Sequence, residues 1–138
     1  MGKLTGKVAI VTGAGGGLGR AHAMLLAHEG AAVIVNDLGG SRDGTGSGSS
    51  MADTVVDEIK AAGGQAAANY GSVTDDGAAE SMVKSAVDHF GRLDILINNA
   101  GILRDRSFKN MTDAEWDAVI DVHLRGSYLA AKHAWQQM

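Results

Sequence analysis

The residues from Thr12 to Gly19 carry the first chemical signal in the sequence. They read Thr-Gly-Ala-Gly-Gly-Gly-Leu-Gly, in which Gly13, Gly17 and Gly19 follow a G-x-x-x-G-x-G spacing. Gly13 allows a sharp turn, Gly17 lets the backbone approach a pyrophosphate, and Gly19 permits close packing of a helix on a sheet. Free amides at the start of that helix would then face the phosphates. We expect the cofactor contacts of this segment at Gly13, Gly16, Gly17, Leu18 and Gly19. The alternative is a glycine-rich turn without a ligand, because the G-x-G-x-x-G spacing fits in no register.

Asp37 lies 24 positions after Gly13 and follows an apolar run. An acid about 20 residues after such a turn accepts hydrogen bonds from the adenosine ribose hydroxyls of a dinucleotide. Its carboxylate would repel a ribose 2′-phosphate, so the sequence favours NAD over NADP. A solvated loop acid is the alternative interpretation of Asp37 taken alone.

Short apolar runs alternate with helical periods along the whole chain. Strands are predicted at 8–11, 32–35, 65–70 and 93–97, and helices at 18–29, 51–62, 79–90 and from the capping box at Thr112 to the C-terminus. A long loop is predicted at 38–50. This alternation indicates an α/β fold with a parallel sheet covered by helices on both faces. Right-handed crossovers restrict the strand order to 3-2-1-4, the N-terminal half of a Rossmann-type doubly wound sheet.

Composition excludes several classes of partner. Apolar residues make up 45% of the chain and charged residues 20%, with a net charge of −4 and no basic stripe, so we expect no nucleic-acid partner. There is no cysteine, and we expect no metal site. No apolar stretch approaches the about 20 residues that span a bilayer, so we expect no membrane partner and a cytoplasmic protein.

The residues directly after the fourth predicted strand are Asn98-Asn99-Ala100-Gly101. Together with the glycine turn, this segment resembles the short-chain dehydrogenases/reductases over essentially the whole chain. The resemblance implies that Asn99, Ala100 and Gly101 border the adenosine ribose and the nicotinamide side of the cofactor, and that Asn98 braces the central strand. It also implies that Ser72 and Val73 flank the adenine, although many relatives have an aspartate where Ser72 stands.

Three further segments, at 36–40, 101–108 and 122–127, are similar to the (3R)-hydroxyacyl-CoA dehydrogenase units of peroxisomal multifunctional enzymes and their bacterial relatives. That resemblance implies NAD-dependent oxidation of a 3-hydroxyacyl-CoA, with an acyl-CoA as the small-molecule partner. It would fit a peroxisomal location if a targeting signal lay outside these residues. Arg104, Arg106 and Lys109 are candidates for holding an acidic CoA group, and a solvated basic loop is the alternative.

The family's chemistry relies on a serine and a Tyr-x-x-x-Lys pair on the next strand and helix. Tyr128 and Lys132 satisfy that spacing but lie one strand and one helix too early, so we interpret them as a chance match. We therefore predict no catalytic residue in this chain, which would be the NAD-binding part, residues 1–138, of a single dehydrogenase domain. His123 occupies the position of a relay asparagine in many relatives. It shares a helical stripe with Trp116, Ile120 and Ser127, so an interior histidine is expected.

Two functions remain open from the sequence. The first is an oxidoreductase fragment that binds NAD, and the second is a dinucleotide-binding or assembly module without catalysis. The outer edge of the apolar strand at 93–97 and the helix after Thr112 both predict self-association into a homo-oligomer.

Overall fold

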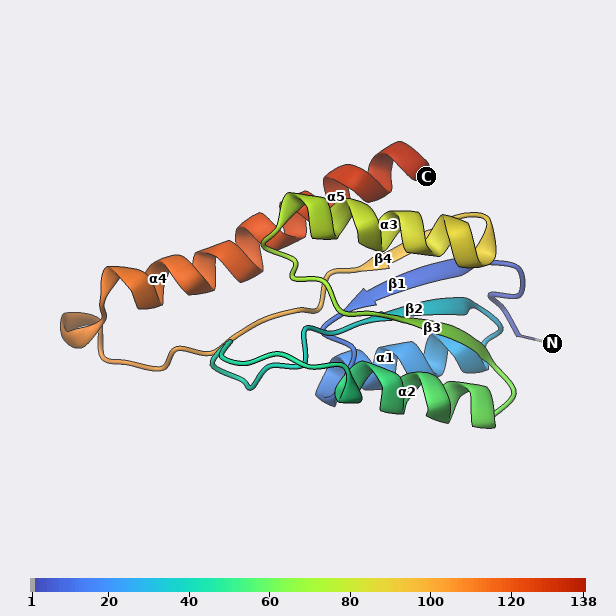
Figure 1. Ribbon diagram of the computed structural model, residues 1–138, viewed down its shortest axis with the longest axis horizontal. Helices are drawn as coiled ribbons and strands as arrows, with labels where there is room; N and C mark the ends of the chain where they lie inside the picture. The colour runs from blue at the N-terminus through green and yellow to red at the C-terminus, as the bar shows by residue number, and fades with distance from the viewer. Residues whose placement is uncertain (1) are drawn as a thin grey trace.

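Four parallel strands form the centre of the computed structural model, which describes residues 2–138 (Figure 1). The strands are β1 (Val8–Thr12), β2 (Ala32–Asn36), β3 (Gln65–Asn69) and β4 (Ile95–Ile97). They pair in the order β3-β2-β1-β4, and the register of β1 on β2 runs from Val8↔Ala32 to Thr12↔Asn36. The predicted fold class and strand order are confirmed.

Helices cover both faces of this sheet. α1 (Gly17–His28) and α2 (Ser50–Ala61) lie below it in Figure 1, and α3 (Asp76–Phe90) and α5 (Gly126–Gln137) lie above it. Strands β1 and β2 are buried along their whole lengths because they are covered on both faces. Val11, Val33 and Val35 pack toward α1 and α2, and Ile10 and Ile34 pack toward α3. This alternation fixes the register of the central strands.

The fourth strand is shorter and less buried than predicted. We expected a buried strand over 93–97, but β4 covers Ile95–Ile97 and is half-buried at the edge of the sheet. Leu93 is buried ahead of the strand, and the Asp94 side chain accepts a hydrogen bond from the backbone N–H of Val8 at 2.9 Å. A carboxylate thus takes part in the contact with β1 before the regular ladder begins.

The C-terminal helical region is interrupted. After a short 3-10 turn, η1 (Phe108–Asn110), α4 (Asp113–Ile120) leads through the π-helical turn η2 (Asp121–Arg125) into α5. The Thr112 hydroxyl caps α4 by accepting from the Glu115 N–H at 3.2 Å. The Glu115 side chain lies 3.3 Å from Arg106 instead of completing the predicted capping box.

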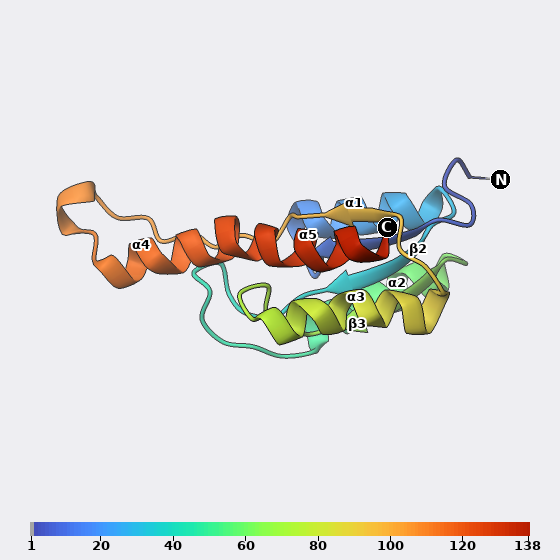
Figure 2. The ribbon, with the colours of Figure 1, turned by 90° about the horizontal axis from the view of Figure 1, so that it is seen from above.

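The prediction that one stripe of this helical region faces the interior is wrong. Trp116, Ile120 and His123 are all exposed, whereas α5 buries Leu129 and Ala130. One extra residue in a π turn rotates the following helix by about 100°, so positions before and after it do not share a face. In addition, α4 extends beyond the end of the sheet and has no layer to pack on (Figures 1 and 2).

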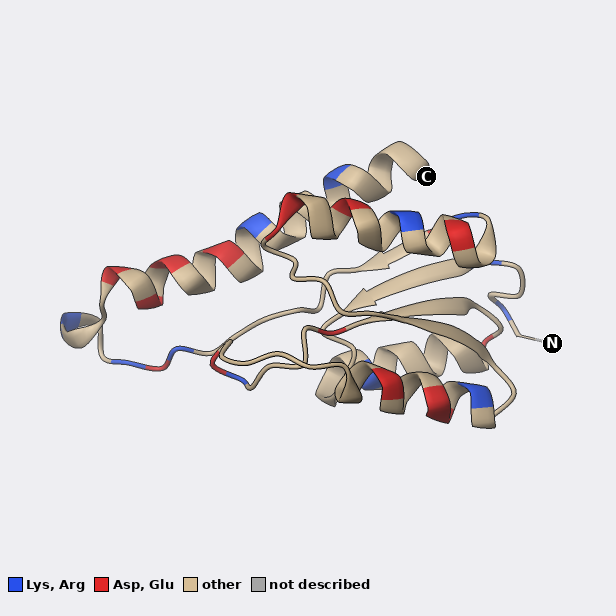
Figure 3. Ribbon diagram, in the orientation of Figure 1, with Lys and Arg blue, Asp and Glu red and all other residues tan. Residues whose placement is uncertain are grey.

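The helices α2 and α3 carry both acidic and basic residues, whereas the charged residues of α4 are all acidic (Figure 3). Among residues 2–138, no helix combines the length and the apolar character that crossing a membrane requires.

Candidate cofactor-binding site

A cavity of about 700 Å³ lies at the carboxyl ends of the strands. Its volume is in the range of small-molecule sites, and this edge of a parallel sheet is where ligands bind in such folds. The predicted cofactor residues on its wall are Gly13, Gly16, Gly17, Asp37, Ser72, Val73, Asn99, Ala100 and Gly101. Leu18 and Gly19 are not on its wall.

The glycine-rich turn opens toward this cavity. Gly13 and Gly17 have φ values of +63° and +52°, in the left-handed region that favours glycine. No described atom lies within 4 Å of the point where a Cβ of Gly17 would be, so the face of the turn is open. Because α1 begins at Gly17, the first amides of the helix, including that of Leu18, have no acceptor inside the helix. These amides fit a bound pyrophosphate.

Gly19 has a different role from the one expected. A Cβ there would overlap the carbonyl oxygen of Gly13 and lie 2.5 Å from Nδ2 of Asn99. The absence of a side chain at Gly19 therefore lets α1 pack closely against the glycine-rich turn, whereas we had expected close packing against the sheet. Gly19 shapes the site from behind its wall.

Asp37 is held by two backbone amides. Its Oδ2 accepts from the N–H of Gly15 at 2.8 Å, and its Oδ1 accepts from the N–H of Gly39 at 2.7 Å. A Cβ on Gly15 would lie 2.7 Å from Oδ2, so this approach requires glycine. Each carboxylate oxygen keeps a further lone pair, and the half-buried group lines the cavity.

Thr12 is a buried positioning residue that the sequence analysis missed. Its Oγ1 accepts from the N–H groups of Asn99 and Ala100 at 3.0 and 2.9 Å. Nδ2 of Asn99 also donates to the carbonyl oxygens of Thr12 and Gly13 at 3.0 and 3.1 Å. The Asn99 side chain thus braces the glycine turn. Asn98, the expected brace of the central strand, instead reaches the carbonyl of Ser127 on α5 at 3.4 Å.

Asn36 performs a similar role at the opposite end of the cavity. It is buried at the end of β2, and its Nδ2 donates to Oδ1 of Asn69 at 2.8 Å and to the carbonyl of Gly71 at 2.9 Å. These bonds hold the backbone that leads to Ser72 and Val73 on the cavity wall. The Ser72 hydroxyl lies 2.8 Å from that of Thr74. A polar residue ending an otherwise apolar strand was the available signal for Asn36.

Residues 38–48, which we name the 38–48 strap, form the outer wall of the cavity. The strap contacts the segment after β4, where the N–H of Leu103 donates to the carbonyl of Arg42 at 2.7 Å and Nε of Arg104 donates to the carbonyl of Asp43. Figure 1 shows the two segments meeting beyond the end of the sheet. Hydrogen bonds from Ser41 and Thr45 hold the pKa of Asp43 well below its usual range, so its carboxylate is committed to the strap.

His123 is exposed, so the expected interior position is wrong. Its ring lies against Gly101, where a Cβ would be 2.7 Å from Cε1, and its Nε2 is 3.0 Å from the carbonyl and 3.2 Å from the N–H of Ile102. The tautomer decides whether Nε2 donates or accepts. The histidine therefore fixes a backbone segment on the cavity wall, and a part in a proton relay stays a prediction.

The other candidates lie elsewhere. Tyr128 is exposed and Lys132 Nζ is 3.5 Å from Asp76 on α3, and neither lines the cavity. Arg106 pairs with Glu115, and Lys109 belongs to η1, so of the three predicted basic residues only Arg104 lines the cavity.

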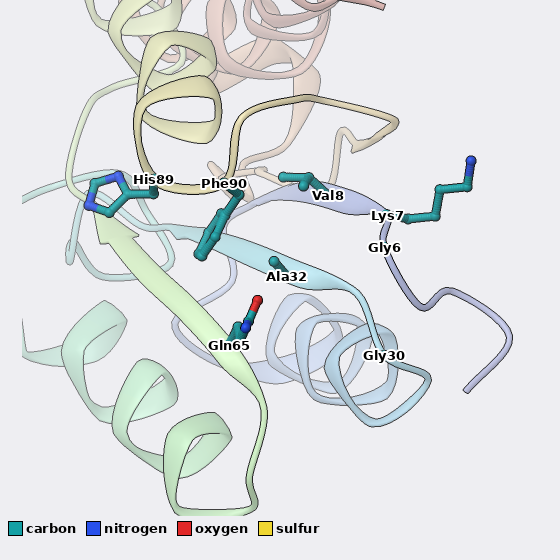
Figure 4. Close-up of a pocket in the computed structure, with 8 residues that line it drawn as sticks. All are labelled: Gly6, Lys7, Val8, Gly30, Ala32, Gln65, His89 and Phe90. Carbon is teal, nitrogen blue, oxygen red and sulfur yellow. The ribbon is translucent and has the colours of Figure 1, made fainter. Parts of the chain in front are cut away.

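A second cavity, of about 410 Å³, lies at the amino ends of the strands (Figure 4). Its wall includes Phe90 and Gln65, and the Lys7 side chain extends away from it. None of the predicted cofactor residues contributes to it. The 700 Å³ cavity is therefore the candidate site.

Known proteins share this architecture. A family model described as short chain dehydrogenase matches residues 7–138. The chain is 57% identical to peroxisomal multifunctional enzyme type 2 of Mus musculus, and the match covers 99% of this chain and 18% of that protein. It is 50% identical to a hydroxyacyl-CoA dehydrogenase of Mycobacterium tuberculosis, and that match covers 95% of this chain and 40% of the relative. The crystal structure of a short chain dehydrogenase from Mycobacterium avium superposes with a TM-score of 0.91 at 51% identity, over 99% of this chain and 47% of that one. The chain thus spans less than half of each of these relatives. It belongs to the short-chain dehydrogenase family.

Proposed function

We propose that this chain binds NAD and forms the cofactor-binding part of an oxidoreductase that acts on a secondary alcohol, a 3-hydroxyacyl-CoA. The observation that carries the proposal is the Asp37 carboxylate, fixed by the amides of Gly15 and Gly39 beside an open glycine turn. The relatives support the substrate class, since one is named a hydroxyacyl-CoA dehydrogenase. The absence of cysteine fits a reducing compartment, and we propose the cytoplasm.

The residues present fit a dinucleotide. The first amides of α1 would hold the pyrophosphate, Asp37 would accept from the adenosine ribose, and the backbone at Ser72 and Val73 would border the adenine. Ala100 and Gly101 would line the nicotinamide side, held in place by Thr12. The bound nicotinamide supplies the hydride acceptor. We further propose that the acid/base groups of the reaction are not among these 138 residues.

Calorimetric titration with NAD and NADP tests the cofactor assignment. We expect NAD to bind more tightly, because the Asp37 carboxylate would lie beside the adenosine ribose and would repel the 2′-phosphate of NADP. Asp37→Ala should narrow the difference by about tenfold, which is about 1.4 kcal/mol. Asp37→Asn separates charge from hydrogen bonding, and Asp57→Asn, an exposed change on α2, is the matched control. Equal or stronger NADP binding by the unmodified protein would contradict the proposal.

A dinucleotide-binding module without catalysis is the second candidate. It is favoured by the position of Tyr128 and Lys132, which point to Asp76 and solvent rather than into the cavity. Both candidates predict that oxidation of 3-hydroxyacyl-CoA by this chain stays at background, since positioned acid/base groups contribute about 10²–10⁴-fold. Turnover that disappears in Tyr128→Phe would show that Tyr128 is the acid/base group after all.

A further inference from the structure

Two arginines line the outer end of the 700 Å³ cavity, away from the glycine turn. Arg42 comes from the 38–48 strap and Arg104 from the segment after β4. Although 62 positions separate them, the backbones of their two segments lie side by side, because the Leu103 N–H donates to the Arg42 carbonyl at 2.7 Å. Ile102 secures the same junction, since its Cδ1 lies 3.1 Å from where a Cβ of Gly44 would be.

Neither guanidinium forms a salt bridge with a carboxylate of the described residues, although the charge of Arg104 contributes to the lowered pKa of Asp43. Within residues 2–138, the salt bridges of arginine involve Arg20, Arg92 and Arg106. The nearest acid of the strap, Asp43, accepts from Ser41 Oγ at 2.7 Å and from the Thr45 N–H at 2.9 Å, so its carboxylate is already bonded. Arg104 uses Nε on the Asp43 carbonyl and keeps its terminal amino groups for another acceptor.

Other charges on the cavity wall limit what this pair can bind. Asp37 and Asp121 also line the cavity, and Asp37 occupies the ribose corner beside the glycine turn. A phosphate carried on the cofactor ribose would meet the Asp37 carboxylate first. An anion at Arg42 and Arg104 is therefore best supplied by a second ligand in the same cavity.

We propose that Arg42 and Arg104 form a subsite for a phosphate monoester, distinct from the pyrophosphate position at α1. Guanidinium groups bind phosphate by paired, charge-assisted hydrogen bonds, which suits two unpaired arginines at one rim. Given the proposed function, on which this part of the inference rests, the phosphate belongs to the coenzyme A portion of the substrate. The 2′-phosphate of NADP is the other source of the same chemistry.

Calorimetry with coenzyme A and with 3′-dephospho-coenzyme A measures how much the 3′-phosphate contributes to the binding affinity. We expect coenzyme A to bind about tenfold more tightly, in line with charged hydrogen bonds. Arg42→Gln and Arg104→Gln should each reduce that ratio, and the double variant should remove it, while Arg104→Lys should retain part of it. Arg106→Gln, a change in the same segment outside the cavity, should leave the ratio unchanged.

Two further titrations separate the alternatives. NAD affinity should change less than about twofold in the arginine variants, which also shows that they are folded. If the variants lose NADP affinity and keep the coenzyme A ratio, the subsite stands and its phosphate belongs to the cofactor. Equal binding of coenzyme A and its dephospho form by the unmodified protein, with NADP unaffected by the variants, overturns the subsite. Absence of NAD binding with the coenzyme A ratio intact would overturn the proposed function alone.

Discussion

Asn99 donates two hydrogen bonds to Thr12 across the end of the sheet. The Asn99 N–H donates to Oγ1 of Thr12 at 3.0 Å, and Asn99 Nδ2 donates to the Thr12 carbonyl, also at 3.0 Å. Because Thr12 ends β1 and Asn99 follows β4, this pair joins the glycine turn to the opposite wall of the cavity. The geometry of the site therefore depends on a buried hydroxyl that touches no expected ligand.

Thr12→Val should destabilise the protein by about 1–3 kcal/mol, because the shape is kept but the half-buried Ala100 N–H loses its acceptor. The Asn99 N–H loses one of its two acceptors and keeps the Ile97 carbonyl at 3.0 Å. Urea unfolding measures the change, and cofactor affinity should fall with it. Thr54→Val, at an exposed position on α2 where the hydroxyl bonds to its own helix, is the control and should be nearly neutral. If Thr12→Val were as stable as the unmodified protein, the Ala100 N–H would not depend on the Thr12 hydroxyl as its acceptor.

Gly19→Ala should destabilise by about 1–3 kcal/mol or more, because the new Cβ would meet backbone that cannot move aside. The atom in its way is the carbonyl oxygen of Gly13, and Asn99 lies behind it. Gly77→Ala is the matched control within α3, where a Cβ would be 3.7 Å from the nearest described atom. That change should stabilise by about 0.5–1 kcal/mol. Thermal unfolding of both variants tests the contrast, and similar melting temperatures would contradict it.

Asp94 should contribute to acid sensitivity. Its hydrogen bonds with Arg92, and then the one from the Val8 N–H, lower the pKa of its carboxyl below the ordinary value. Because the pKa of Asp94 is lower in the folded than in the unfolded protein, the ionised carboxylate stabilises the fold. This stabilisation is fully present above the unfolded-state pKa of about 4, and it is lost as the pH falls through the folded-state pKa. Asp94→Asn should therefore lower stability at pH 7 by about 1–3 kcal/mol and have less effect at pH 3.

Unfolding curves between pH 7 and pH 2 measure this dependence. Asp88→Asn is the control, since that exposed acid forms only an i,i+4 pair with Lys84 and should change stability by less than about 0.5 kcal/mol. If Asp94→Asn lowered the free energy of unfolding by the same amount at every pH, the charge of the carboxylate would not be the source of its stabilising effect.

The 138-residue chain should self-associate. β4 is at the edge of the sheet, and its outer edge has no partner strand in the described part of the chain. Leu124, Tyr128 and Trp135 also present an apolar stripe, with 67%, 60% and 82% of their surfaces exposed. Light scattering should show species larger than a monomer, and the fraction of the protein in these larger species should rise with the protein concentration.

Substitutions assign the interface. Trp135→Glu should reduce association if α5 is used, and leave it unchanged if the β4 edge is used. Leu25→Glu, at an exposed apolar position on α1 across the sheet, is the control. A monomer independent of concentration would refute the prediction.

The sequence by itself determined the frame of the protein. Short apolar runs located the strands, and a period of 3.6 residues located the helices. Right-handed crossovers restricted the strand order to the one observed. The predicted strand order also implied that the glycine turn, Asp37 and the segment around Asn99 line one cavity, because parallel strands have their carboxyl ends at the same edge of the sheet. These features follow from local pattern and chain handedness.

Only the tertiary structure decided the short β4, the exposure of His123 and the direction of the Asn99 side chain. It also decided that Arg42 and Arg104 line the same cavity. Each depends on contacts between residues far apart in the chain, such as Val8 with Asp94 and Leu103 with Arg42. The π turn at Asp121–Arg125 likewise shifted the helix phase that a regular period had predicted. Local periodicity records which face of an element is apolar, but the partner that covers that face, and the hydrogen bonds made there, are set when distant segments pack together.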